Sequence, residues 1–351
     1  MKFISITGLT LFLIEPVSSV MRNTPARLPI IFSKNYDVTL FGIEKLHPFD
    51  TEKFSKTHKY LMKKLKLRKD QFYSPEMISE EDLLLVHTTG YLASLNTSHN
   101  IAKIIELGIL ALFPNYILNE RLLKPMKYAT GGTVLAGELA LKYGWAINLS
   151  GGYHHAKADS GGGFCFYADV PVAVYKLWKD NPKLKVLIID LDAHQGNGNE
   201  SIFRDDPRVD IFDVYNESIY PFDEEVKKYI KYHFPIKTDA EWFRNNQCDE
   251  KYLALLQKNI PVAIEKSKPG LIVYNAGTDI YQKDPLGSMG ISEEGIIKRD
   301  EIVFKNALKN KIPVLMILSG GYTAESAGII AGSIDNILKN VIRWGDLKNE
   351  N

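Results

Sequence analysis

Two aspartates and one histidine are the residues of this chain with the clearest capacity for metal chemistry. Asp192 and His194 follow one segment rich in isoleucine and leucine, and Asp279 follows another. Such segments are typical of strands buried on both faces of a parallel sheet. In open α/β sheets the carboxyl ends of these strands converge on a crevice that binds ligands. One imidazole and two carboxylates there would hold a zinc ion and leave a coordination position free for water and substrate.

The Asp-x-His pattern is common, and by itself it is more often a solvated turn than a metal site. Asp190 changes that balance, because alternation along a strand would send Asp190, Asp192 and His194 to the same side. Three polar groups on one face of a buried strand need a partner. With only two cysteines in the chain, a structural zinc closed by thiolates is not expected.

Two further clusters supply groups for proton transfer and charge stabilisation. His154 and His155 point in different directions, so we do not expect them to bind one ion together. An isolated pair would usually be structural, but beside a metal one could serve as general base and the other as an electrostatic partner. Tyr322 follows a Gly pair that allows close approach to a ligand, and its phenol could stabilise an oxyanion. These parts predict a metal-assisted amide hydrolase.

The segments around these clusters alternate between strand and helix patterns. Strands are expected at 28–32, 145–149, 185–189, 209–214, 271–274 and 314–318, and helices at 51–67, from 79 onward, 125–143, 170–178, 198–203, 249–265, 292–308 and 324–342. Asp50 is expected to cap the helix that follows it, and the acidic residues after Ser79 favour the start of the next helix. This alternation predicts a doubly wound parallel sheet flanked by helices. Because the site would span residues 153–322 and no linker interrupts it, we expect a single domain over residues 21–351.

Composition excludes some functions and leaves the location open. The chain has 43 basic and 42 acidic side chains, so no global field favours direct nucleic-acid binding. The basic run at 59–69 is interpreted as a solvated helix face. Residues 1–20 contain an apolar stretch of signal-peptide length, which is too short to span a membrane. We expect a cytoplasmic protein without a membrane span, with export through this segment as the alternative.

Five ordered motifs resemble those of zinc-dependent histone deacetylases. They are Gly-Gly-Tyr-His-His-Ala at 151–156, Gly-Gly-Gly-Phe-Cys at 161–165, Asp-Leu-Asp-Ala-His-Gln-Gly-Asn-Gly at 190–198, Ala-Gly-Thr-Asp at 276–279 and Ser-Gly-Gly-Tyr at 319–322. The sequences of these motifs, and that of the segment 41–50, are most similar to the class IV branch. The resemblance runs from about residue 28 to 337. It implies the arginase-type α/β fold and hydrolysis of acyl groups from lysine side chains.

The resemblance also implies roles for the metal and proton-transfer residues. Asp192, His194 and Asp279 would bind zinc. His155 would be the general base, and His154, hydrogen-bonded to Asp190, the electrostatic catalyst.

The same resemblance implies a carbonyl-binding role for Tyr322 and an orienting role for Asn197 toward His155, where better-known branches carry Asp. The loss of that carboxylate should make His155 less basic. A structural potassium ion would be held by Asp190 and Asp213, together with the carbonyl groups of Asp192 and His194.

The acyl-lysine tunnel would be lined by Phe164, Tyr220 and Leu286, with Gly152 and Gly163 beside them. Small residues at 151–152 and 161–163 would leave room in its wall, which favours long fatty-acyl chains over acetyl groups; the alternative is that these glycines serve only turn geometry. The predicted function is therefore a zinc-dependent lysine deacylase acting on proteins or peptides. The alternatives are an acetylpolyamine amidohydrolase, a two-manganese ureohydrolase and a catalytically silent acyl-lysine reader. The oligomeric state is left open.

Overall fold

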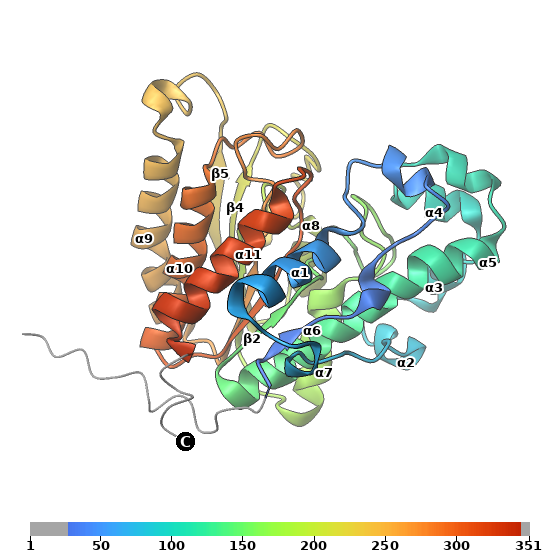
Figure 1. Cartoon of the computed structure of the whole chain (residues 1–351), viewed down its shortest axis with the longest axis horizontal. Helices are drawn as coiled ribbons and strands as arrows, with labels where there is room; N and C mark the ends of the chain where they lie inside the picture. Colours follow the sequence, from blue (N-terminus) through green and yellow to red (C-terminus); the bar gives the residue numbers. More distant parts are fainter. Residues whose placement is uncertain (1–26, 345–351) are drawn as a thin grey trace, which may run out of the picture.

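A computed structural model describes residues 27–344, and a seven-stranded parallel sheet runs through this part of the chain (Figure 1). Its strands lie in the order β1-β2-β7-β6-β3-β4-β5, and every neighbouring pair is parallel. The strands are β1 (Ile30–Ile31), β2 (Trp145–Asn148), β3 (Val186–Asp190), β4 (Val209–Asn216), β5 (Tyr232–Ile236), β6 (Leu271–Asn275) and β7 (Val314–Ile317). The predicted doubly wound parallel sheet is confirmed.

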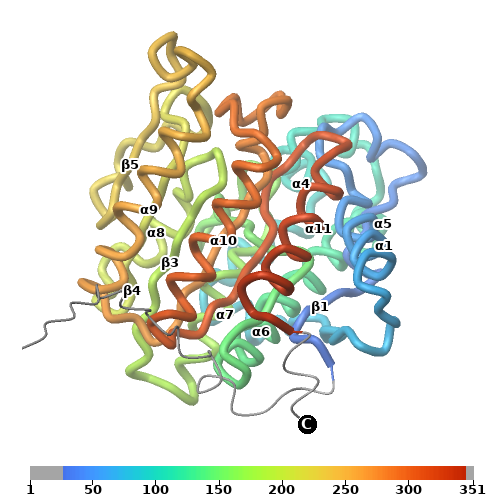
Figure 2. Tube along the Cα trace, turned by 60° about the vertical axis from the view of Figure 1, so that its left-hand side comes forward, coloured from blue at the N-terminus to red at the C-terminus, as the bar shows by residue number. Residues whose placement is uncertain are grey.

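Helices cover both faces of this sheet. The longer ones are α1 (Lys53–Leu65), α6 (Lys124–Tyr143), α7 (Asp169–Asp180), α8 (Asn197–Phe203), α9 (Cys248–Ser267), α10 (Glu293–Lys309) and α11 (Ser326–Asn336). Side chains of α1, α9, α10 and α11 share one apolar core with the sheet, and those of α6, α7 and α8 share the other. Figure 2 shows α10 and α11 lying together on one side. The result is a three-layer helix–sheet–helix arrangement.

Strand β3 shows why the central strands of the sheet are unbroken apolar runs in the sequence. Leu187 and Ile189 enter the core under α1, α9, α10 and α11, whereas Val186 and Ile188 enter the core under α6, α7 and α8. Successive side chains of a strand point to opposite faces, and both faces are covered here. Polar residues are therefore excluded until the strand reaches its carboxyl end, where Asp190 lies.

A separate lobe of short helices packs beside the sheet, at the right of Figure 1. It contains α2 (Glu80–Leu83), α3 (Thr89–Ser94), α4 (Ser98–Ile104) and α5 (Asn115–Leu118). They surround a third apolar core that includes Leu83, Ile101 and Leu110. The predicted helix start at Ser79 is confirmed, and its hydroxyl accepts a hydrogen bond from the backbone N–H of Asp82, but the helix ends after one turn. The other three helices were not predicted, because segments of one or two turns show no extended helical periodicity.

Two details of the predicted elements are wrong. Strand β5 was missed because it lies at the edge of the sheet, is only partly buried and contains Pro235, which a central strand would not tolerate. Asp50 does not cap α1, which begins after Glu52. Its carboxylate instead accepts the backbone N–H of Glu52 at 3.0 Å and pairs with Lys56.

The expected exposure of the basic run is seen in the structure, since Lys59, Lys63, Lys66 and Lys69 are all exposed. Within the described residues 27–344, no helix is both long and apolar enough to cross a bilayer. The signal-like segment predicted at 1–20 lies outside the described residues.

Candidate metal centre and its cavity

The predicted metal ligands lie in two loops that follow neighbouring strands. Asp192 and His194 follow β3, which ends at Asp190, and Asp279 follows β6, which ends at Asn275. Strands β3 and β6 are adjacent in the sheet, with Asp190 opposite Asn275. Because parallel strands end at the same edge, both loops emerge at the same place.

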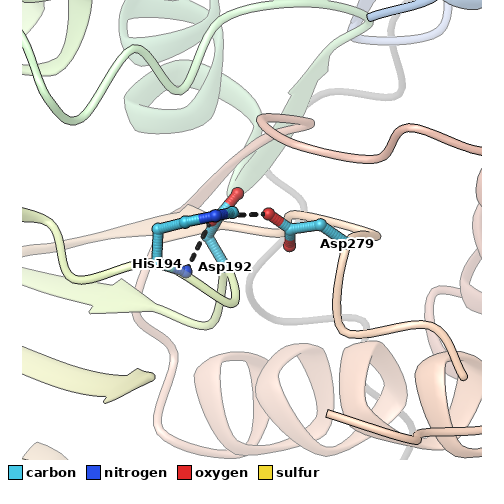
Figure 3. Close-up of side chains that lie close together, drawn as sticks. All are labelled: Asp192, His194 and Asp279. Atoms are coloured by element: carbon cyan, nitrogen blue, oxygen red, sulfur yellow. Dashed lines mark hydrogen bonds and ion pairs between the residues drawn. The ribbon is translucent and has the colours of Figure 1, made fainter. Parts of the chain in front are cut away.

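Asp192, His194 and Asp279 form a tight buried group (Figure 3). The Nδ1 atom of His194 lies 2.9 Å from a carboxylate oxygen of Asp279 and 3.1 Å from one of Asp192. One donor atom from each residue lies within 4.8 Å of the other two. This is one nitrogen and two oxygen donors at the spacing that a single ion requires.

The turn after β3, and not strand alternation, brings Asp192 and His194 together. The strand ends at Asp190, so both ligands lie beyond it. The backbone N–H of His194 donates to the Asp192 carboxylate at 2.9 Å and closes the turn. The predicted pairing is therefore present, but the alternation argument used to reach it was wrong.

The charges of this group favour a bound cation. Burial, followed by the neighbouring Asp192 charge, raises the pKa of Asp279 to about 7. Burial opposes the charged form of Asp192 as well, yet His154 and His194 hold the pKa of Asp192 well below its usual range. Two crowded carboxylates in a buried site are stabilised by a positive ion, so the donor set fits a metal.

Glycine at position 320 allows the loop after β7 to reach this group. A Cβ atom there would lie 2.3 Å from a carboxylate oxygen of Asp279 and 2.7 Å from one of Asp192. The bare backbone instead donates its N–H to Asp192 at 2.9 Å. Any side chain at Gly320 would displace a ligand.

His154 lies beside the group as a charged imidazole. Its Nδ1 is 2.9 Å from the Asp190 carboxylate, and the amide of Asn275 holds the other oxygen of Asp190 at 2.9 Å. Burial opposes protonation of His154, but Asp190 and Asp192 raise its pKa to about 9. This raised pKa favours the charged form of the ring at neutral pH, which suits an electrostatic role better than that of a base.

His155 has the opposite character. Burial, followed by the charges of His154 and His194, lowers the pKa of His155 well below its usual range. Its Nδ1 lies 2.8 Å from the amide oxygen of Asn197. An N–H donated there leaves Nε2 with a free lone pair, which is the form a general base needs.

Asn197 is held in turn by Asp223. The amide nitrogen of Asn197 donates to Asp223 at 3.0 Å, and Lys157 pairs with the same carboxylate at 2.8 Å. A carboxylate is therefore present behind His155, but one hydrogen bond further away. This arrangement fixes the His155 ring without a carboxylate hydrogen-bonded directly to it.

Tyr322 keeps its proton. Burial, followed by the charges of Asp279 and Asp192, raises the pKa of the Tyr322 phenol well above its usual range. Its ring centroid lies 6.4 Å from that of His194. Its backbone N–H donates to Asp284 at 2.7 Å, which holds the residue at the end of its loop. The phenol is thus a neutral hydrogen-bond donor beside the metal ligands.

Lys53 is a buried contributor that the sequence interpretation missed. From α1 its ammonium donates to the backbone carbonyls of Ser319 at 2.7 Å and Gly320 at 2.9 Å. Burial lowers the pKa of Lys53 to about 8 against the attraction of Asp279 and Asp192. Its position in a basic, helix-forming segment showed nothing of this contact, which depends on α1 packing under the loop after β7.

A second carboxylate cluster lies behind His154. Asp190 and Asp213 are opposite each other on β3 and β4 and are completely buried. Burial, followed by the charges of Asp190 and Glu200, raises the pKa of Asp213 well above its usual range. Among residues 27–344, nothing donates a hydrogen bond to one carboxylate oxygen each of Asp213 and Glu200 or to the amide oxygen of Gln195. Orphaned buried oxygens of this kind fit a cation with oxygen ligands.

A cavity opens onto these groups and continues into the helical lobe. It contains about 840 Å³ of empty space, open mouth included. One side carries Asp192, His154, His155 and Tyr322. The other side is apolar and is formed by Val38, Leu40, Ile105, Leu107, Leu110, Leu122 and Met126. Most of these apolar residues belong to the core of the lobe, so the cavity lies between the lobe and the loops of the sheet.

The predicted tunnel residues lie in different places. Gly152, Gly163 and Phe164 line the cavity. Tyr220 is not among its lining residues, but its ring packs against His155 with centroids 4.9 Å apart. Leu286 is also absent from the lining and lies in a turn whose backbone N–H groups are held by Asp284.

The glycines do not create the free space, contrary to the volume argument made from the sequence. A Cβ atom on Gly152 would lie 2.3 Å from the Asn275 side chain, and one on Gly163 would lie 2.4 Å from the His155 ring. Both have positive φ. They allow close packing of loops, and the space comes instead from the apolar residues of the lobe, which sequence reasoning treated as ordinary core.

Comparisons with known proteins indicate the family and the fold of this chain. The model of the histone deacetylase domain family matches residues 47–338. Histone deacetylase 2 of Arabidopsis thaliana is 42% identical over 312 residues, which cover 89% of this chain and 79% of that protein. Human histone deacetylase 1 is 27% identical over 342 residues, which cover 91% of this chain and 67% of that protein. The crystal structure of the HDA15 HD domain matches with a TM-score of 0.71 at 19% identity, covering 90% and 92% of the two chains, and supports the fold.

Proposed function

The chain belongs to the histone deacetylase family, and from that membership we propose that it is a zinc-dependent hydrolase of acyl-lysine side chains in proteins. The observation that carries the proposal is the buried group of Asp192, His194 and Asp279, in which Asp192 lines a cavity also lined by His155 and Tyr322. Within the family, Asn197 in place of Asp supports assignment to the class IV branch.

Asp192, His194 and Asp279 would hold the zinc. A bound zinc would supply Lewis acidity for the scissile carbonyl and for the attacking water. Three protein ligands would leave a zinc ion able to bind water and substrate, and Asp192 lines the cavity through which both could reach it.

The chain's own residues would move the protons. His155, neutral because its pKa is lowered by burial, takes a proton from the attacking water at Nε2 and passes it to the leaving lysine amine. His154 keeps its charge beside Asp190 and stabilises negative charge nearby. Tyr322, protonated in its buried position, donates a hydrogen bond to the oxygen of the tetrahedral intermediate.

We propose that long fatty-acyl groups are accepted in addition to acetyl. The support is the apolar wall that includes Leu110, Leu122 and Met126, because acetyl alone would not need it. Each methylene buried there would contribute about 0.8 kcal/mol. A chain of several methylenes would therefore gain more from the wall than a short acyl group can.

A potassium ion is proposed for the second carboxylate cluster. Asp190 and Asp213, with the carbonyl groups of Asp192 and His194, would bind it. The unpartnered oxygen of Asp213 supports this assignment, and the ion would offset the charge that raises the pKa of that carboxyl.

One experiment tests the function. Rates are measured on acetyl-, octanoyl- and myristoyl-lysine versions of one peptide and on acetylputrescine, with and without a chelator. We expect hydrolysis of the peptides that is lost with chelator and restored by zinc. Faster hydrolysis of acetylputrescine than of every peptide would favour a polyamine substrate, and chelator-resistant hydrolysis would overturn the zinc assignment.

A further inference from the structure

Arg299 of helix α10 is a fully buried cation that touches both ligand-bearing loops. Its exposed fraction is 0%. One terminal nitrogen donates to the carbonyl of Leu191 at 3.1 Å and to that of Gly277 at 2.5 Å, and the other donates to the carbonyl of Ala276 at 3.2 Å. Leu191 lies directly before the ligand Asp192, and Gly277 lies two residues before the ligand Asp279.

The three carbonyls lie at the places where the sheet stops supporting the chain. Strand β3 ends at Asp190 and strand β6 ends at Asn275. Beyond these points, the separation of the two loops depends on contacts other than the β ladder. The backbone N–H of Ala193 donates to the Asp279 carboxylate at 2.9 Å, and the planar guanidinium of Arg299 binds carbonyls of both loops. Both contacts therefore constrain the separation of the two loops.

The guanidinium of Arg299 is held in place by Asp300. Its Nε donates to Asp300 at 2.7 Å. Asp300 also accepts hydrogen bonds from the hydroxyls of Tyr274 on β6 and Ser333 on α11. Asp300 therefore fixes the plane of the guanidinium against the sheet and a second helix, and it compensates the buried charge.

We infer that Arg299 is a positioning residue for the metal, one that sets zinc affinity by clamping the loops of Asp192 and Asp279 together. The inference rests on the proposed zinc site. Lysine cannot replace arginine here, because one ammonium on a flexible stem lacks the fixed fork that reaches carbonyls of two loops at once. Groups that orient metal ligands typically change metal affinity or activity by about 10–100-fold when mutated.

The test measures zinc affinity by chelator competition, which needs no enzymatic activity. Arg299→Lys should bind zinc about 10–100-fold more weakly than the parent. Excess zinc should restore its kcat, because His155 and Tyr322 are untouched. Val303→Ala is the matched control: Val303 is buried on the same helix, so its truncation should lower the melting temperature without changing zinc affinity.

Each outcome decides the inference. An Arg299→Lys protein with the parent's zinc affinity, or a Val303→Ala protein that loses affinity equally, would reduce Arg299 to an ordinary core residue. If Arg299→Lys does not fold, Asp300→Asn is measured instead, and unchanged affinity there would overturn the inference. A parent that binds no zinc would overturn the proposed metal and, with it, this inference. A parent that binds zinc while Arg299→Lys keeps the same affinity would overturn only this inference.

Discussion

His155 is adjacent to His154 in the chain, yet their surroundings shift the two pKa values in opposite directions. His154 is 2.9 Å from the Asp190 carboxylate, which together with Asp192 raises its pKa to about 9. His155 instead contacts a neutral amide, and burial lowers its pKa. Burial and the charges of His154 and His194 lower the pKa of His155, whereas its hydrogen bond to Asn197 raises it. The expectation that Asn197 leaves His155 less basic than an aspartate would stays a prediction. Two identical side chains therefore differ in the charge that their surroundings favour, which supports the different roles proposed for them.

The phenol of Tyr322 gives the first prediction at the residue scale. Tyr322→Phe should keep the metal and lower kcat by about 10²–10³-fold, the usual effect of removing one oxyanion donor. Zinc content and single-turnover rates on an acyl-lysine peptide measure this. A variant as fast as the parent would mean that the phenol does not contact the reacting oxygen.

The ligand group gives the second prediction. Asp192→Asn and His194→Ala should each lose zinc while keeping the parent's far-ultraviolet circular dichroism, because their neighbours still fill the site. Metal analysis after dialysis measures the loss. Asp206→Asn, which removes a carboxylate from the surface pair with Arg208, is the matched control and should retain zinc. Full zinc occupancy in both ligand variants would contradict the assignment.

Helix α1 shows how one element can support both a site and the fold. Lys53 near its start binds the carbonyls of Ser319 and Gly320. One turn later, His58 stacks on Phe32 with ring centroids 3.9 Å apart and meets the edge of Phe72. The buried face of the helix therefore carries two ionisable groups that form no ion pair with any residue of the described range 27–344.

His58 makes stability depend on pH. Burial, followed by the charge of Lys69, lowers its pKa from 6.5 to about 4. In the unfolded chain the ring takes up a proton below 6.5, so the stabilisation is present above that pH and is lost as the pH falls from 6.5 toward 4. The slope for one proton is at most about 1.4 kcal/mol per pH unit.

His58→Phe should remove that slope, because phenylalanine can still stack on Phe32 and cannot be protonated. Urea unfolding of the metal-free protein is measured at pH 5, 6 and 7. The stability difference between variant and parent should shift in favour of the variant as the pH falls. Phe32→Leu is the control, since it should weaken the stack equally at each pH. A pH-independent difference for His58→Phe would contradict the interpretation.

At the scale of the whole molecule, the cavity exists because the lobe packs against the loops of the sheet. Its catalytic wall comes from loops after β2, β3 and β7, and its apolar wall comes from residues 38–126. Neither part encloses a cavity alone. The proposed acceptance of long acyl chains therefore depends on how the two parts pack, and we expect it to be sensitive to the size of side chains in the lobe.

Leu122→Trp tests that dependence by filling the apolar side. We expect kcat/KM for a myristoyl-lysine peptide to fall about 100-fold, equivalent to losing burial of three or four methylenes, while the acetyl-lysine value changes less than about twofold. Tyr116→Trp is the control, because Tyr116 is 71% exposed on the same lobe. Equal loss on both substrates would mean that the wall serves only stability.

How much the sequence alone determined depends on the range of the interactions involved. The central strands were predictable because burial on both faces demands continuous apolar runs, and Asp190 marks where one run stops. The residue types in the loops, read with the family motifs, were enough to propose the ligands and the pair His154–His155. Edge strand β5 escaped prediction because it is only partly buried.

Only the tertiary structure decided what depends on contacts between distant segments. Lys53 meets Ser319, and Arg299 meets Leu191, across more than a hundred residues, and neither side chain carries a local pattern that marks the contact. The apolar wall of the cavity is made of residues that resemble ordinary core residues in the sequence, and only the packing of the lobe places them beside the cavity. Gly152 and Gly163 illustrate the same limit, since the sequence shows where a side chain is missing, and only the packing shows that the Asn275 side chain and the His155 ring occupy the space.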